Sequence, residues 1–116
     1  MTIESWKEEF LPGSPDSWEK MSDLEALKHA EKKWKGLSPE NLEKHGLRKH
    51  TCLILGTDGV LRMDGHSCAL CQKHDLECST CPLQDCELEW GAWVYGGDAK
   101  PMQNLIRTTL EKKVND

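Results

Sequence analysis

The sequence predicts a small α+β fold in a single domain that spans all 116 residues. Three observations lead to this prediction. Apolar residues recur at helical spacing, with capping signals, over residues 1–50; an Asp-Gly pair separates two apolar runs in residues 51–63; and two CxxC pairs follow. We therefore expect a helical part at 1–50, a hairpin and metal-binding part at 51–97, and a C-terminal helix at 98–116.

The first helix is predicted from Ile3, Trp6 and Phe10, whose spacing places them on one helical face. Pro12 and Gly13 then end it, because proline and glycine favour turns over a continuing helix. We expect a short amphipathic helix that is docked by its aromatic side chains, followed by a turn-rich link over residues 13–17.

A second helix is predicted to begin at Ser22, which forms a capping-box pattern with Glu25. Gly36 is predicted to end it as a left-handed C-terminal cap. One face of this helix is apolar and consists of Leu24, Leu27, Ala30 and Trp34.

Ser38 and Pro39 start a further short helix, since proline suits the first helical position. This helix runs through Leu42 and ends at Gly46 and Leu47. The two helices and their short connection predict an αα corner.

An antiparallel hairpin is predicted from Asp58 and Gly59, which lie between the apolar runs 51–55 and 60–63. An Asp-Gly pair favours a tight turn because both residues tolerate positive φ. Cys52, at the start of the hairpin, is interpreted as a buried core thiol and not as a metal ligand.

The strongest motif is formed by two CxxC pairs, Cys68 with Cys71 and Cys78 with Cys81, joined by the polar connector 72–77. Each pair spans a tight turn, and four thiolates complete the tetrahedral set that structural zinc takes in proteins. The sequence therefore predicts a compact zinc knuckle with these four ligands.

Three further residues are alternative ligands. Cys86 lies on one face with Leu83 and Trp90 if a short helix starts at Pro82, and it would then point back to the site or into the core. His66 and His74 could each replace a thiolate. An iron-sulfur cluster, a redox dithiol and disulfides remain alternatives, although nothing at the N-terminus resembles the signal peptide of an oxidising compartment.

Residues 90–97 form an aromatic segment that contains Trp90, Trp93 and Tyr95 and is interrupted by glycines. These side chains either cover the metal site or form an exposed docking surface. A final helix is expected from residue 99 to 113, capped by Asp98. Its apolar stripe consists of Met102, Leu105, Ile106 and Leu110.

The chain is acidic, with 20 Asp and Glu against 15 Lys and Arg and a formal net charge of -5. This charge disfavours binding of nucleic acid over the whole surface, although a local basic patch could still bind it. The most basic stretch is 44–50, in which Lys44, Arg48 and Lys49 are candidate contact residues. No apolar run approaches the about 20 residues of a membrane span, so we expect a cytoplasmic protein.

The sequence contains no HExxH, phosphate-binding glycine loop or nucleophile-elbow serine. The zinc-deaminase pattern also fails, because Ser67 and Cys68 follow His66 where that pattern requires a glutamate two positions on. We therefore expect no enzymatic activity, and a closed structural metal site is the simpler interpretation.

The run WKGLSPENLEKHGL from Trp34 to Leu47, taken with Cys68, Cys71, Cys81 and Cys86, resembles small cysteine-rich proteins of bacteriophages and prophages. The resemblance covers most of the chain. It implies a bacterial host cytoplasm and a role in host takeover or counter-defence, and it transfers no catalytic residue.

These observations predict a zinc-stabilised binding or regulatory module that docks on a protein partner. Docking would use the αα corner together with the aromatic segment. The alternatives are a nucleic-acid-binding, zinc-finger-like regulator that uses the stretch 44–50, and a redox or iron-sulfur protein.

Overall fold

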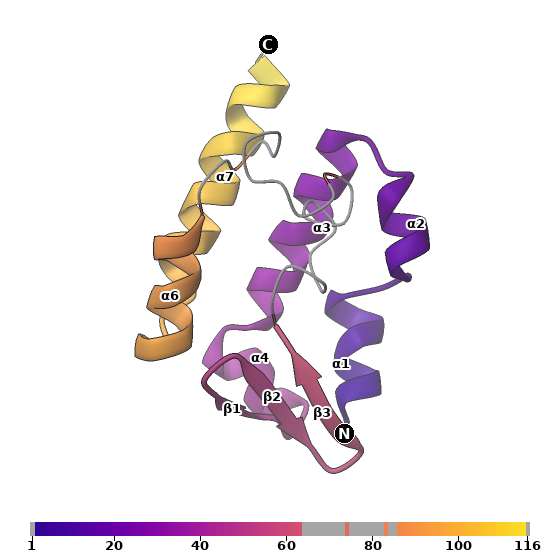
Figure 1. Ribbon diagram of the computed structural model, residues 1–116, viewed down its shortest axis with the longest axis vertical. Coiled ribbons are helices and arrows are strands. Elements are labelled where there is room, and N and C mark those ends of the chain that lie inside the picture. The colour runs from indigo at the N-terminus through magenta and orange to yellow at the C-terminus, as the bar shows by residue number, and fades with distance from the viewer. Residues whose placement is uncertain (1, 64–73, 75–82, 84–85, 116) are drawn as a thin grey trace.

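The computed structural model describes residues 2–63, 74, 83 and 86–115, and in these residues the predicted α+β class is confirmed (Figure 1). In this part of the chain four helices precede a three-stranded antiparallel sheet, and two helices follow it. The helices are α1 (Ile3–Phe10), α2 (Pro15–Glu19), α3 (Asp23–Gly36), α4 (Pro39–Lys44), α6 (Glu87–Gly96) and α7 (Lys100–Asn115). The strands are β1 (Arg48–His50), β2 (Leu53–Gly56) and β3 (Gly59–Arg62).

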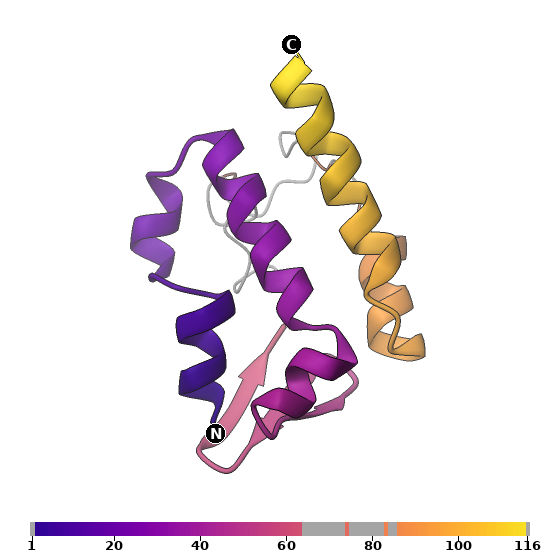
Figure 2. The ribbon, with the colours of Figure 1, turned by 180° about the vertical axis from the view of Figure 1, so that it is seen from behind.

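Helix α3 lies between α1 and α7 in both views of the chain (Figures 1 and 2). It begins with the capping box of Ser22 and Glu25, as predicted. Its apolar face is buried against its neighbours because residues three and four apart share one side of a helix. The buried residues at this centre are Ala26, Leu27, Ala30 and Trp34 of α3, Trp6 and Phe10 of α1, and Met102 and Ile106 of α7.

Gly36 does not have the left-handed conformation that the sequence predicted. It is the last residue of α3, and the cap residue Leu37 has φ -86°. A Cβ at Gly36 would lie 2.3 Å from Cγ of Phe10, so glycine is required by the close approach of α1 to α3. The Trp6 indole N–H donates to the Gly36 carbonyl at 2.8 Å at the same crossing.

Residues 13–17, predicted as a turn-rich link, instead enter helix α2. At its start the Ser14 N–H donates to Ser17 Oγ at 3.0 Å, and Ser17 Oγ donates to the Ser14 carbonyl at 2.8 Å. Trp18 is buried, and its indole N–H donates to the Pro12 carbonyl at 3.0 Å. The short helix therefore folds its tryptophan back onto the segment that precedes it.

Helix α4 confirms the predicted αα corner. Its C-terminus is closed by Gly46, which has φ 67°, with Leu47 N bonded to the Leu42 carbonyl and Gly46 N bonded to the Glu43 carbonyl. This is the Schellman arrangement, which satisfies carbonyls that the end of a helix leaves free.

The predicted hairpin is confirmed as β2 and β3, but it belongs to a three-stranded sheet with the order β1-β2-β3. The register pairs Ile54 with Lys49 on one side and with Leu61 on the other. The sequence prediction missed β1 because this edge strand consists of basic residues only. Within the β2–β3 turn only Gly59 has positive φ, at 140°, whereas Asp58 does not.

Helix α6 begins at Glu87 with Cys86 as N-cap, and the aromatic segment 90–97, expected to be broken by glycines, is helical up to Gly96. The short helix expected to start at Pro82 lies outside the described residues. Gly97, with φ 70°, ends α6 as a left-handed cap. Helix α7 then follows as predicted, and the Asp98 carboxylate accepts from Lys100 N at 3.0 Å.

Candidate docking site and cysteine segment

Five of the predicted metal ligands lie outside the described residues: His66, Cys68, Cys71, Cys78 and Cys81. Within the described ranges, no three His, Cys, Asp or Glu side chains come together as a metal-binding group. The zinc knuckle therefore remains a prediction from the sequence.

The alternative ligand His74 is described, and its Nε2 lies 2.9 Å from Oδ1 of Asp23 at the start of α3. This contact joins the cysteine-rich stretch to the central helix. A histidine that binds a metal commonly has its other ring nitrogen bonded to a carboxylate. The Asp23 contact is compatible with that arrangement, because it leaves Nδ1 of His74 for a further ligand.

The thiols in the described part of the chain are those of Cys52 and Cys86, and both are half-buried. Cys86 packs against the core and precedes the first turn of α6. Cys52 also packs against the core, which agrees with its interpretation as a structural thiol, although it is less buried than predicted.

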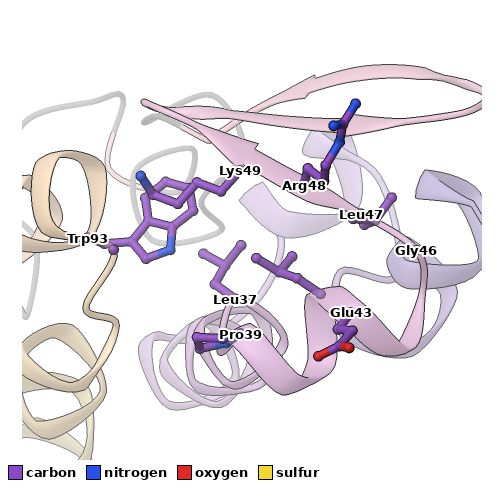
Figure 3. Close-up of a pocket in the computed structure, with 10 residues that line it drawn as sticks. Leu37, Pro39, Glu43, Gly46, Leu47, Arg48, Lys49 and Trp93 are labelled. Atoms are coloured by element: carbon purple, nitrogen blue, oxygen red, sulfur yellow. The ribbon is translucent and has the colours of Figure 1, made fainter.

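The αα corner and the aromatic segment meet at a shallow pocket of about 550 Å³ (Figure 3). Its inner surface is apolar and consists of four buried side chains: Leu37, Leu42, Leu47 and Trp93. Its outer part has the exposed residues Pro39, Glu43, Gly46, Arg48 and Gly97, and the half-buried Lys49. Helix α4, strand β1 and the end of α6 therefore contribute to one site.

Lys49 has an internal role at this pocket. Its Nζ donates to the Val94 carbonyl at 2.7 Å and lies 4.9 Å from the centroid of a Trp93 ring. Burial lowers the pKa of Lys49, while the nearby Cys52 opposes that shift. Arg48 points away from the indole and is exposed, so it is the cation that a ligand would meet at the outer part of the pocket (Figure 3).

Lys44 is also bonded within the chain. Its Nζ lies 3.2 Å from Oε2 of Glu9, while Oε1 of Glu9 lies 2.7 Å from Nε2 of the buried His45. The His45 hydrogen bond, followed by that from Lys44, lowers the pKa of Glu9. In the stretch 44–50, Lys44 thus contacts α1 and Lys49 contacts α6.

Ser5, His45 and Glu9 form a continuous hydrogen-bonded chain, with 2.9 Å between Ser5 Oγ and His45 Nδ1. Such a set of residues resembles an activated serine. However, Ser5 Oγ also donates to the Thr2 carbonyl at 2.8 Å and accepts from Thr2 N at 3.0 Å. These bonds are those of a capping box at α1, so we interpret the cluster as a tie between α1 and α4.

The three aromatic candidates have different environments. Trp93 is 0% exposed, so its interpretation as an exposed docking residue is wrong. Its ring packs edge-on against that of Trp34, with 5.5 Å between the ring centroids. Trp90 is half-buried, and its indole N–H donates to the Met63 carbonyl at 3.0 Å. Tyr95 is 85% exposed, as a docking surface requires.

Leu88 was not predicted as a surface residue, yet it is 86% exposed. It lies seven positions before Tyr95, which places both on one face of α6. After Glu87 and Glu89 in its first turn, helix α6 has no charged residue, a composition that is typical of a buried helix. The available signal was the composition of residues 87–96, which offers too few polar residues to cover an outer face.

A second site was also missed by the sequence analysis. A groove of about 890 Å³ lies between α3 and α7, and its lining includes four cations. Three of them, Lys28, Lys32 and Lys35, recur at helical spacing along α3, and this spacing was visible in the sequence. The described residues of the lining are Lys28, Glu31, Lys32, Lys35, Gln103, Asn104, Arg107 and Leu110.

Comparison with protein-family models, with curated proteins and with solved structures found no match. Among the described residues, none of the helices has both the length and the apolar character that crossing a membrane requires. The described geometry defines a small α+β domain with a pocket at an αα corner.

Proposed function

We propose that the chain is a zinc-stabilised docking module that binds a protein partner in the bacterial cytoplasm. The pocket at the αα corner receives one apolar side chain of that partner. The observation that carries this proposal is the joint contribution of α4, β1 and α6 to a single apolar pocket. Protein interfaces commonly place an apolar anchor in such a pocket and surround it with polar residues.

The chemistry of the pocket defines its occupant. Leu37, Leu42 and Leu47 offer an apolar surface that suits a leucine, methionine or aromatic side chain. At its outer part Arg48 is exposed, so an acidic residue next to the anchor would find a cation there. Glu43 disfavours a second acidic residue on its side, which gives the contact a direction.

The outer face of α6 supports docking by a second route. Leu88 and Tyr95 expose apolar surface on the same helix whose C-terminal end lines the pocket. Exposed apolar side chains on one helix face favour an interface when they lie beside an apolar pocket. A partner that covers both would bury the side of α6 that this chain leaves open.

Zinc has a structural role in this proposal. Cys68, Cys71, Cys78 and Cys81 would hold the ion, and a closed set of four thiolates contributes folding free energy but no reaction. The described residues next to this stretch support a structural role, since Met63 and Leu83 are buried in the core before and after it. The resemblance to small phage proteins supports the bacterial cytoplasm as the location.

Site-specific crosslinking tests the proposal. A photoreactive phenylalanine analogue replaces Arg48 in one variant and the exposed Lys20 in a matched control, and both are expressed in bacteria. We expect one defined protein adduct from position 48 and none from position 20. The adduct should disappear when Glu replaces Leu42 in the pocket, in a variant whose fold is verified by circular dichroism. Equal labelling from positions 20 and 48, or unchanged labelling in the Leu42→Glu variant, contradicts the proposal.

The redox and iron-sulfur alternative has a simple readout. Iron-sulfur clusters absorb visible light, whereas zinc thiolates do not. Protein purified without oxygen should therefore be colourless and contain zinc. A visible band with matching iron content would replace the zinc assignment.

A further inference from the structure

The groove between α3 and α7 shares none of its described lining residues with the proposed protein-docking pocket. Figure 2 shows the two helices side by side and running in opposite directions, and the Gln103 side chain joins them by donating to the Trp34 carbonyl at 2.8 Å. Lys28, Lys32 and Lys35 follow one another along the α3 side, and Arg107 lies on the α7 side. A chain with a net charge of -5 thus concentrates four cations at one groove.

These four cations are free of internal partners. Lys44 and Lys49 are bonded to Glu9 and Val94, whereas within the described ranges none of the four groove cations has an ion pair or a side-chain hydrogen bond. The adjacent Lys33 is different, because it is 2% exposed and lies on another side of α3. Among the described residues, the α3–α7 groove is therefore a better candidate site for an anionic ligand than the basic stretch 44–50 that the sequence suggested.

The unbroken row of cations favours a phosphate backbone over an acidic peptide. Lys28 and Lys35 are separated by about 10 Å along the helix axis, with Lys32 between them. Every nucleotide carries a phosphate, so a strand offers a negative charge at each step whatever its sequence. An extended peptide presents a side chain to one face about every 7 Å and is anionic there only where that side chain is Asp or Glu.

We propose that the α3–α7 groove binds the phosphate backbone of a single-stranded nucleic acid without reading its sequence. The concave shape favours one strand, because a positively charged groove follows a flexible backbone better than it accepts a rigid duplex. Among the described residues that line the groove, none offers an aromatic ring on which bases could stack, so binding depends on charge. This inference is independent of the proposed protein partner.

Glu31 provides an internal check, since it is a carboxylate in the same lining and repels phosphate. Removal of the Glu31 charge should strengthen binding of the nucleic acid, whereas a substitution that only disturbed the fold would weaken it. The Glu31→Gln variant is therefore expected to bind several-fold more tightly than the wild type at low salt.

The experiment measures the anisotropy of a labelled oligothymidylate of about 16 nucleotides with the full chain. Four phosphate contacts on a single strand predict a slope of log K against log salt of about -3. Affinity should therefore fall roughly 50-fold between about 50 and 200 mM salt. Substitution of all four cations by Gln should weaken binding at least tenfold and flatten the slope, and Arg107→Gln alone should reduce the steepness of the slope by about one quarter.

The matched control is the Lys20→Gln, Lys100→Gln variant, which removes exposed lysines outside the groove and should bind as the wild type does. Three results would overturn the proposal: unchanged binding in the groove variants, stronger binding to duplex than to single strand, or displacement of the oligonucleotide by polyglutamate at equal charge concentration. Glu31→Gln and Arg107→Gln are single exposed or half-buried changes, so they test the groove even if the fourfold variant does not fold.

Discussion

Asp58 and Ile3 lie 55 positions apart and are joined by a hydrogen bond of 2.8 Å from the Ile3 backbone N–H to Oδ1 of Asp58. The other carboxylate oxygen accepts from Glu4 N at 3.1 Å. A residue of the β2–β3 turn thereby caps the first turn of α1, where free N–H groups and the helix dipole favour a negative charge. The Thr2 side chain caps the same helix by accepting from Ser5 N at 3.1 Å.

Replacement of Asp58 by Ala should therefore lower the stability of the domain and loosen α1 against the sheet. The hydrogen bond from Ile3, followed by that from Glu4, holds the pKa of Asp58 below its ordinary value of 3.8. A lowered folded-state pKa gives stability that is present above 3.8 and is lost as the pH falls through the folded-state pKa. Urea denaturation should show wild type and variant converging at the acid end of the profile. Parallel profiles down to the most acidic pH would contradict this linkage.

Glu9 has a second acid-sensitive contact, because it binds both His45 and Lys44. The pKa of Glu9 is lowered from 4.5, first by the His45 hydrogen bond and then by that of Lys44. Glu9→Gln should destabilise the domain above pH 4.5, and this difference should vanish as the pH falls through the lowered pKa. Denaturation midpoints measured between about pH 3 and 7 test this window.

The control for Glu9 is Glu8→Gln. Glu8 is the preceding residue, is exposed, and has no ion pair among the described residues. It should change the denaturation midpoint little at any pH. If both variants shift the midpoint equally, the effect belongs to overall charge and not to the contact with His45.

Signals that act within a few residues were read correctly from the sequence, and contacts between distant residues were not. The Ser22–Glu25 capping box and the Gly46 cap each depend on four to six neighbouring residues, and both were predicted. The role of Gly36 depends on Phe10, which is 26 positions away, and so the local pattern of a helix-ending glycine was misleading.

The candidate site shows the same division. The αα corner and the aromatic segment were predicted separately, and their meeting at one pocket follows from tertiary packing. The burial of Trp93 and the exposure of Leu88 depend on which side of α6 faces the core, and the mostly apolar residues 90–96 give no periodic signal for that side. Strand β1 was missed because an edge strand of three basic residues lacks the apolar alternation by which strands are recognised.

If zinc binds Cys68, Cys71, Cys78 and Cys81, its removal should lower the stability of the whole domain. If the ion closes the segment that holds these cysteines, each tenfold increase in free zinc should raise the free energy of unfolding by about 1.4 kcal/mol until binding to the unfolded chain competes. Exhaustive chelation should lower the melting temperature and expose Met63 and Leu83, which are now buried.

Single Cys→Ser changes at Cys68, Cys71, Cys78 and Cys81 should each reduce the zinc content measured by metal analysis. Cys52→Ser is the matched control, because Cys52 is a half-buried thiol outside the cluster and should leave the zinc content unchanged. A chelated protein that still melts cooperatively at the wild-type temperature would exclude a structural role for the metal.

Gly36 of α3 and Gly91 of α6 give the sharpest test of helix packing. Gly→Ala within a helix ordinarily stabilises a protein by about 0.5–1 kcal/mol, because alanine restricts the unfolded chain and favours the helix. At Gly36 the new Cβ would lie 2.3 Å from Cγ and 2.6 Å from Cβ of Phe10, so α1 must shift away from α3. We expect Gly36→Ala to destabilise the domain by about 1–3 kcal/mol.

Gly91→Ala is the control. The heavy atom nearest to a Cβ added at Gly91 is Cδ2 of Tyr95 at 3.9 Å, so this variant should stabilise the domain. Chemical denaturation of both variants measures the two free energies, and a stabilised Gly36→Ala protein would show that α1 does not approach α3 at this residue.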